Sequence, residues 1–139
     1  MQYEPPLYEL TGTVVHGLGN GHTVGMPTAN LPCPAGDQHP PFGVYASIVA
    51  VDGMRYIGVT NVGSRPSVDS SPTPTVETWL LDYTGNLYGK QITVGLMRFL
   101  RPTVKMESLQ AVREQVQKDA EAARRCMSQI KDSADGSFQ

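Results

Sequence analysis

The hydrophobic pattern of this chain changes its period once, near residue 107, and that change limits the folds open to it. Up to residue 101, short apolar-rich runs are interrupted by most of the chain's 14 glycines and 11 prolines. Such runs, bounded by Gly and Pro, are typical of β-strands. Further on, apolar residues recur at steps of three or four, which predicts a helix over about 107–127. The chain therefore consists of strands followed by one terminal helix.

The predicted strands cover residues 8–16, 43–51, 54–63, 75–83 and 90–101. Asp52-Gly53, between two of these runs, strongly indicates a hairpin because a type I′ turn needs positive φ at its central residues. Ser108 is a suitable N-cap for the helix. The apolar stripe of that helix comprises Met106, Leu109, Val112, Val116, Ala120 and Ala123. Five or six strands with no helix between them, then one helix, predict a closed or nearly closed antiparallel β-barrel.

Length and charge exclude several classes of protein. A chain of 139 residues fits one domain, which we place at 1–130, with 131–139 as a polar, disordered tail. A net charge of −2 gives no electrostatic case for nucleic acid or an anionic membrane as partner. No membrane-length apolar run, secretory signal, disulfide framework or zinc motif is visible. We expect a monomer in the cytoplasm.

The segment 17–30 contains four closely spaced glycines, Gly17, Gly19, Gly21 and Gly25, before Pro27. Glycines let backbone N–H groups crowd around phosphate oxygens, although a turn-rich connection explains the segment equally well. Thr28 and Asn30 follow, and on an extended segment their side chains point the same way. Both offer the hard oxygen atoms that Mg²⁺ prefers, alongside phosphates and water. The absence of a following lysine rules out the P-loop pattern.

Three further side chains each allow a structural and a functional interpretation. Glu77, in a predicted strand, is either a solvated acid or a general base that accepts the proton of an attacking alcohol. Tyr88 offers a stacking surface or simply ends a strand. Arg101 either binds a ligand or covers the end of the barrel as a solvated cation. Trp79 is predicted to lie in the core. Spacing alone does not decide between these alternatives.

Taken in order, seven blocks of this sequence resemble the riboflavin kinase family over residues 10–125. They are G-T-V-V-H-G-L-G-N-G at 12–21, G-M-P-T-A-N-L at 25–31, G-V-Y-A at 43–46, G-V-T-N-V-G-S-R-P-S at 58–67, V-E-T-W-L-L-D-Y at 76–83, N-L-Y-G at 86–89 and F-L-R-P at 99–102. The block G-x-P-T-A-N is the most specific of them. Their fixed order carries more weight than any single block.

The resemblance implies a mainly β fold, a six-stranded antiparallel Greek-key barrel with a C-terminal α-helix beside the flavin site. It implies transfer of the γ-phosphoryl group of ATP to the 5′-hydroxyl of riboflavin, giving FMN, with Mg²⁺ bound at Thr28 and Asn30. Glu77 matches the catalytic carboxylate. The positions matching the ATP and phosphate contacts are Gly17, Gly19, His22, Gly25, Pro27, Thr28 and Tyr88. The positions matching the flavin contacts are Arg101, Val104 and Met106.

This sequence departs from the usual family pattern at His22, Trp79, Asn86, Thr103 and Met106. These departures bear on ATP affinity and ring stacking, and none of them falls on Thr28, Asn30 or Glu77. Three alternatives stay open: a barrel that binds flavin or nucleotide without turnover, the excised kinase domain of a bifunctional FAD synthetase, and a small β-barrel interaction domain. Because no nucleotidyltransferase segment precedes the barrel, we do not expect FAD formation.

Overall fold

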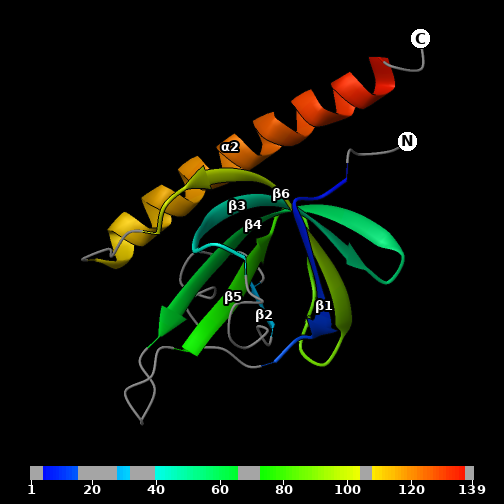
Figure 1. Ribbon diagram of the computed structural model, residues 1–139. Helices are drawn as coiled ribbons and strands as arrows, with labels where there is room; N and C mark the ends of the chain where they lie inside the picture. Colours follow the sequence, from blue (N-terminus) through cyan, green and yellow to red (C-terminus); the bar gives the residue numbers. More distant parts are fainter. Residues whose placement is uncertain (1–4, 16–27, 32–39, 66–72, 104–107, 137–139) are drawn as a thin grey trace.

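The computed structural model describes residues 5–15, 28–31, 40–65, 73–103 and 108–136. Its elements are β1 (Tyr8–Thr13), β2 (Thr28–Leu31), β3 (Gly43–Val51), β4 (Met54–Arg65), β5 (Thr73–Leu80), β6 (Gln91–Arg101) and α2 (Leu109–Gly136). The strands form one antiparallel sheet in the order β1-β6-β3-β4-β5-β2. The sheet curls, and α2 lies across its outer side (Figure 1). The predicted mainly β fold with a C-terminal helix is confirmed.

The strand order explains how the sheet curls into a barrel. Strands β3, β4 and β5 are neighbours, and β6 returns to lie beside β3, which is the Greek-key arrangement. The two edge strands then approach each other beyond the end of β1. There the backbone N–H of Val15 donates to the carbonyl oxygen of Asn30 at 2.8 Å, and the two residues form an isolated antiparallel bridge. Asn30 therefore lies where the barrel closes.

Two apolar clusters hold the fold together, one on each face of the sheet. The cluster inside the barrel comprises Val14, Ala29, Leu31, Tyr45, Val49, Val51, Val62, Val76, Leu80, Leu87, Ile92, Val94 and Leu96. The cluster between the sheet and α2 comprises Val44, Ala46, Val59, Trp79, Met97, Val116, Ala123 and Met127. Alternate residues of β5 thus serve different cores, because successive strand side chains point to opposite faces. Trp79 lies in the core, as predicted.

Local sequence signals account for several element ends. Asp52 and Gly53 have φ values of 52° and 82°, so the predicted hairpin turn is confirmed. Strand β5 ends at Leu80 rather than 83, because Asp82 adopts a left-handed φ of 61° and turns the chain. The Ser108 side-chain oxygen accepts the backbone N–H of Ala111 at 3.0 Å, which confirms the predicted N-cap.

The terminal helix is longer than the apolar pattern predicted, since α2 runs to Gly136. Among the α2 side chains that the structure describes, Met127 is the last buried one, so the apolar pattern that predicted the helix stops at 127. In the described part of the chain, no helix is long and apolar enough to cross a membrane. Cys126 is a free thiol, whereas Cys33 lies outside the described residues.

Candidate functional site

One row of directly paired residues crosses five strands of the sheet. Arg101 of β6 pairs with Val44 of β3, Val44 pairs with Asn61 of β4, Asn61 pairs with Glu77 of β5, and Glu77 pairs with Asn30 of β2. Side chains of directly paired residues project from the same face of a sheet. The row lies on the outer face, where α2 packs, because Val44 belongs to the cluster beneath that helix. It joins three residues predicted for the site, Arg101, Glu77 and Asn30.

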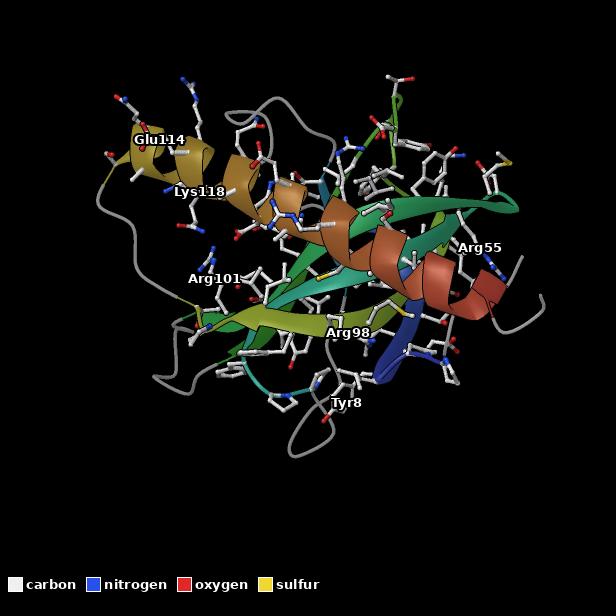
Figure 2. All side chains as sticks on the ribbon, turned by 90° about the horizontal axis from the view of Figure 1, so that it is seen from above. Tyr8, Arg55, Arg98, Arg101, Glu114 and Lys118 are labelled. Atoms are coloured by element: carbon white, nitrogen blue, oxygen red, sulfur yellow. The ribbon has the colours of Figure 1, made fainter. Side chains whose placement is uncertain are left out.

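A cavity of about 130 Å³ lies at the Arg101 end of this row, between the sheet and α2. Figure 2 shows Arg101 beside the N-terminal half of α2, at the same end as Glu114, whereas Arg55 lies at the opposite end of the helix. The cavity is lined by Val44, Asn61, Trp79, Arg101, Thr103, Val112, Gln115, Val116 and Asp119. Apolar and aromatic surface is thus combined with a few polar groups, a composition suited to a partly apolar ring with polar edges.

Glu77 is the carboxylate of the row, and it lies between two amide side chains. Asn61 and Asn30 are its direct partners on the neighbouring strands, and all three side chains are partly buried. Burial disfavours the charged carboxylate and raises the pKa of Glu77 above its ordinary value. A carboxylate whose pKa is raised toward neutrality is a stronger proton acceptor than a fully solvated one. Its environment therefore suits general base catalysis.

Thr28 and Asn30 lie on one face of β2, as the sequence predicted. Thr28 pairs with Trp79 and Asn30 pairs with Glu77, and those two partners share the outer face of β5. The strand thus presents one hydroxyl and one amide oxygen next to the Glu77 carboxylate. This donor set fits Mg²⁺, which takes a few hard protein oxygens and completes its shell with phosphates and water.

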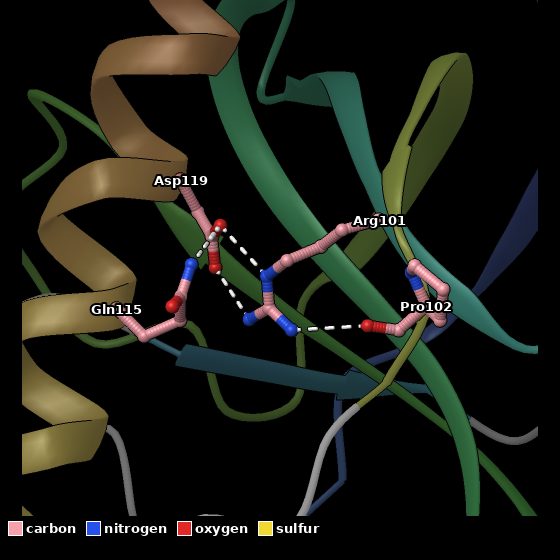
Figure 3. Close-up of polar contacts among 4 residues, drawn as sticks. All are labelled: Arg101, Pro102, Gln115 and Asp119. Atoms are coloured by element: carbon pink, nitrogen blue, oxygen red, sulfur yellow. Dashed lines mark hydrogen bonds and ion pairs between the residues drawn. The ribbon is translucent and has the colours of Figure 1, made fainter.

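Arg101 is held by α2 through a partly buried polar network (Figure 3). Its Nε donates to Asp119 Oδ1 at 3.0 Å, and its Nη2 donates to Asp119 Oδ2 at 2.7 Å. Its Nη1 donates to the Pro102 carbonyl oxygen at 3.1 Å. Gln115 Nε2 also donates to Asp119 Oδ1, at 3.0 Å. Arg101 is therefore an oriented group in the cavity wall rather than a solvated cation at the barrel end.

Tyr88 lies apart from the cavity, in the turn between β5 and β6. Its ring is exposed, and its backbone N–H donates to Asn86 Oδ1 at 2.9 Å. The next residue, Gly89, donates its N–H to the carbonyl oxygen of Val14 at 3.0 Å. This turn therefore borders the end of β1, next to the Val15–Asn30 bridge.

Several predicted site residues lie outside the described part of the chain, and their roles stay predictions. They are Gly17, Gly19, His22, Gly25, Pro27, Val104 and Met106. Conversely, sequence reasoning missed Asn61, Gln115 and Asp119. Asn61 carried a weak signal, since it interrupts the apolar positions of its strand. The two helix residues carried none, because polar residues on an amphipathic helix are ordinarily solvated.

Together, these features define a Greek-key β-barrel protein with a carboxylate-centred site on its outer face and a cavity beneath its terminal helix. The chain matches the family model described as Flavokinase: Riboflavin kinase over residues 5–127. It therefore belongs to the riboflavin kinase family, as its sequence blocks suggested.

The chain is also similar to individual proteins and solved structures. The bifunctional riboflavin kinase/FMN adenylyltransferase of Bacillus subtilis is 34% identical over 126 residues, an alignment that covers 89% of this chain and 40% of that protein. A solved chain titled macrolide-efflux protein, from Streptococcus pneumoniae, is 30% identical with a TM-score of 0.74, covering 86% of this chain and 38% of that one. The riboflavin kinase structure of Trypanosoma brucei has a TM-score of 0.59 at 22% identity, covering 89% and 83% respectively, and so supports the fold. This chain spans about two fifths of the length of the curated relatives it matches.

Proposed function

We propose that this chain is a riboflavin kinase, which transfers the γ-phosphoryl group of ATP to the 5′-hydroxyl of riboflavin and releases FMN and ADP. The observation that carries the proposal is the row across the sheet. It runs from a partly apolar cavity at Arg101, past a carboxylate of raised pKa at Glu77, to Asn30 of β2, whose neighbour on the same strand face is Thr28. Phosphorylation of riboflavin needs these three sites in this order: one for the ring, a base beside the terminal hydroxyl, and one for the phosphates.

The span of the row suits the size of the substrate. Arg101 and Glu77 are three strand spacings apart, which is about 14 Å at about 4.8 Å per strand. In our proposal the tricyclic ring of riboflavin occupies the cavity beneath α2, with Trp79 and Val116 as its apolar walls. The ribityl chain then follows the row past Asn61, so that its terminal hydroxyl reaches Glu77.

Phosphoryl transfer requires little covalent chemistry from the protein, so alignment and charge stabilisation provide most of the catalysis. Glu77 would accept the proton of the 5′-hydroxyl as the oxygen–phosphorus bond forms and the bond to ADP breaks. Thr28 and Asn30 would hold Mg²⁺, which when bound neutralises charge on the phosphate oxygens.

The remaining contacts belong to segments outside the described residues and to one exposed side chain. For the ATP phosphates and nucleotide we propose Gly17, Gly19, His22, Gly25, Pro27 and Tyr88. For the flavin ring we propose Val104 and Met106 beside Arg101. The exposed turn that carries Tyr88 borders the Val15–Asn30 bridge. This position, close to the proposed metal ligand Asn30, supports Tyr88 as a nucleotide contact.

The test is an assay of the purified protein with riboflavin, ATP and Mg²⁺, with riboflavin, FMN and FAD separated by chromatography. FMN that appears only with active protein, and only with ATP, would establish the kinase. Tight binding of riboflavin or ADP without FMN formation would instead indicate a non-catalytic binding module. FAD formed from FMN would contradict the expectation that this barrel does not adenylylate.

A further inference from the structure

We propose that Asp119 is a positioning residue for substrate binding, acting through Arg101. In this inference, which rests on the proposed function, Asp119 fixes the Arg101 guanidinium as a preformed hydrogen-bond donor for the carbonyl edge of the flavin ring, within an ion pair of zero net charge. Asp119 is on α2 and Arg101 is on β6, so the donor forms only when the helix is docked on the sheet.

The hydrogen bonds of Arg101 leave part of its donor capacity for a ligand. A guanidinium carries five N–H groups in a rigid fork. Three of them are engaged by the two Asp119 oxygens and the Pro102 carbonyl, and the other two have no partner among the described residues. Because the bidentate pair fixes the plane of the fork, it also fixes the direction of the remaining N–H groups. Arg101 lines the cavity, so a ligand there meets an oriented donor.

Asp119 is in turn held rigidly by its own helix. Its carboxylate accepts three hydrogen bonds, two from Arg101 and one from Gln115, which lies one helical turn earlier. The side chain of Asp119 is only 7% exposed, and that of Arg101 is 23% exposed. Burying a charged group is costly unless it is paired and hydrogen-bonded, and the contacts of Asp119 meet both conditions. The pair therefore fixes the height and rotation of α2 over this end of the cavity.

The charge of the network indicates which chemical group it binds. Asp119 neutralises Arg101, so the cavity wall offers N–H donors without a net positive charge. Such a wall suits the carbonyl oxygens of a neutral ring better than a phosphate, because it has no net positive charge to balance the negative charge of a phosphate. The phosphate-binding groups that we propose lie at the other end of the row, on β2.

The chain offers a matched control for a purely structural role. Arg124 of α2 also forms a bidentate pair, at 2.8 and 3.1 Å, with Asp82 in the turn that follows β5. Both partners are largely exposed, and neither lines the cavity. Asp82→Asn thus removes a helix-to-sheet ion pair without touching the cavity wall.

The experiment measures riboflavin and MgADP dissociation constants for the full chain and its variants, together with kcat, KM and thermal unfolding. Trp79 is the only tryptophan in the sequence and lines the cavity, so quenching of its fluorescence reports riboflavin binding directly. Asp119→Asn should weaken riboflavin about tenfold or more, because a charged hydrogen-bond donor loses its orientation. MgADP affinity should stay unchanged, and Asp82→Asn should leave both affinities unchanged.

A double-mutant cycle separates positioning from direct contact. If Asp119 acts through Arg101, adding Asp119→Asn to Arg101→Gln should weaken riboflavin no further than Arg101→Gln alone. The double variant carries two neutral amides and no unpaired buried charge, so it provides the comparison even where Asp119→Asn alone folds poorly. A further tenfold loss in that background, equal losses for riboflavin and MgADP, or wild-type affinity in Asp119→Asn would each overturn the inference. Failure of the wild-type protein to bind riboflavin would overturn the proposed function and this inference with it.

Discussion

Replacing Glu77 with glutamine should separate binding from chemistry. Glutamine has the shape of glutamate and keeps the place between Asn30 and Asn61, but it cannot accept a proton. A positioned general base typically contributes about 10²- to 10⁴-fold to the rate, which is about 3–5 kcal/mol of barrier. We expect kcat to fall by that factor while riboflavin and MgADP dissociation constants change little.

The pH dependence follows from the raised pKa of Glu77, whose cause is burial. Below that pKa the carboxyl group is protonated, so wild-type kcat/KM should fall as the pH is lowered through a value above the ordinary 4.5. In the Glu77→Gln variant, kcat/KM should not show this fall at low pH. The raised pKa also affects stability. Glu77 keeps its proton to a higher pH in the folded protein than in the unfolded chain, so the protonated carboxyl group favours folding. This contribution to the free energy of unfolding is lost as the pH rises through the pKa of the folded state. The variant should therefore be at least as stable as the wild type at pH 8, and the difference should vanish near pH 4.

The assay is FMN formation in single-turnover and steady-state experiments, with binding measured separately. Glu114→Gln is the matched control, because Glu114 is an exposed residue of α2 that bonds only Gln110 among the described contacts. This control should retain wild-type turnover. Near-normal turnover in Glu77→Gln, or the same acid limb in both proteins, would refute the role of Glu77 as base.

Three further substitutions test the metal site and the fold. Thr28→Ala should raise the Mg²⁺ concentration needed for half-maximal rate about tenfold, and an unchanged Mg²⁺ dependence would contradict metal binding there. Val116→Ala should lower the free energy of unfolding in urea by about 1.5–3 kcal/mol, since the side chain is buried between α2 and the sheet; a loss below about 0.5 kcal/mol would refute that packing. Gly53→Ala should destabilise by about 1 kcal/mol, measured the same way, through its φ of 82° alone, because its missing Cβ meets open space.

Local chemistry determined much of this protein from the sequence alone. The alternation of strand residues, the Asp52-Gly53 turn and the Ser108 cap each depend on a few neighbouring residues, and the structure confirms them. The common face of Thr28 and Asn30 is equally local, because alternation along a strand sets it. The sequence blocks in their order were enough to indicate the family. The monomeric state, the cytoplasmic location and the polar tail at 131–139 stay predictions.

Tertiary structure decided what the site contains. Pairing register is set by packing between strands far apart in the sequence, so only the folded sheet shows Arg101, Glu77 and Asn30 in one row with Asn61 among them. The raised pKa of Glu77 depends on burial, which no short segment encodes. Asp119 belongs to a helix whose polar residues mostly face water. It becomes a buried partner of Arg101 only because α2 packs on the sheet with Asp119 next to the end of β6. Sequence periodicity can identify the buried side of a helix, but the partner of each residue on that side follows from the packing of the whole chain.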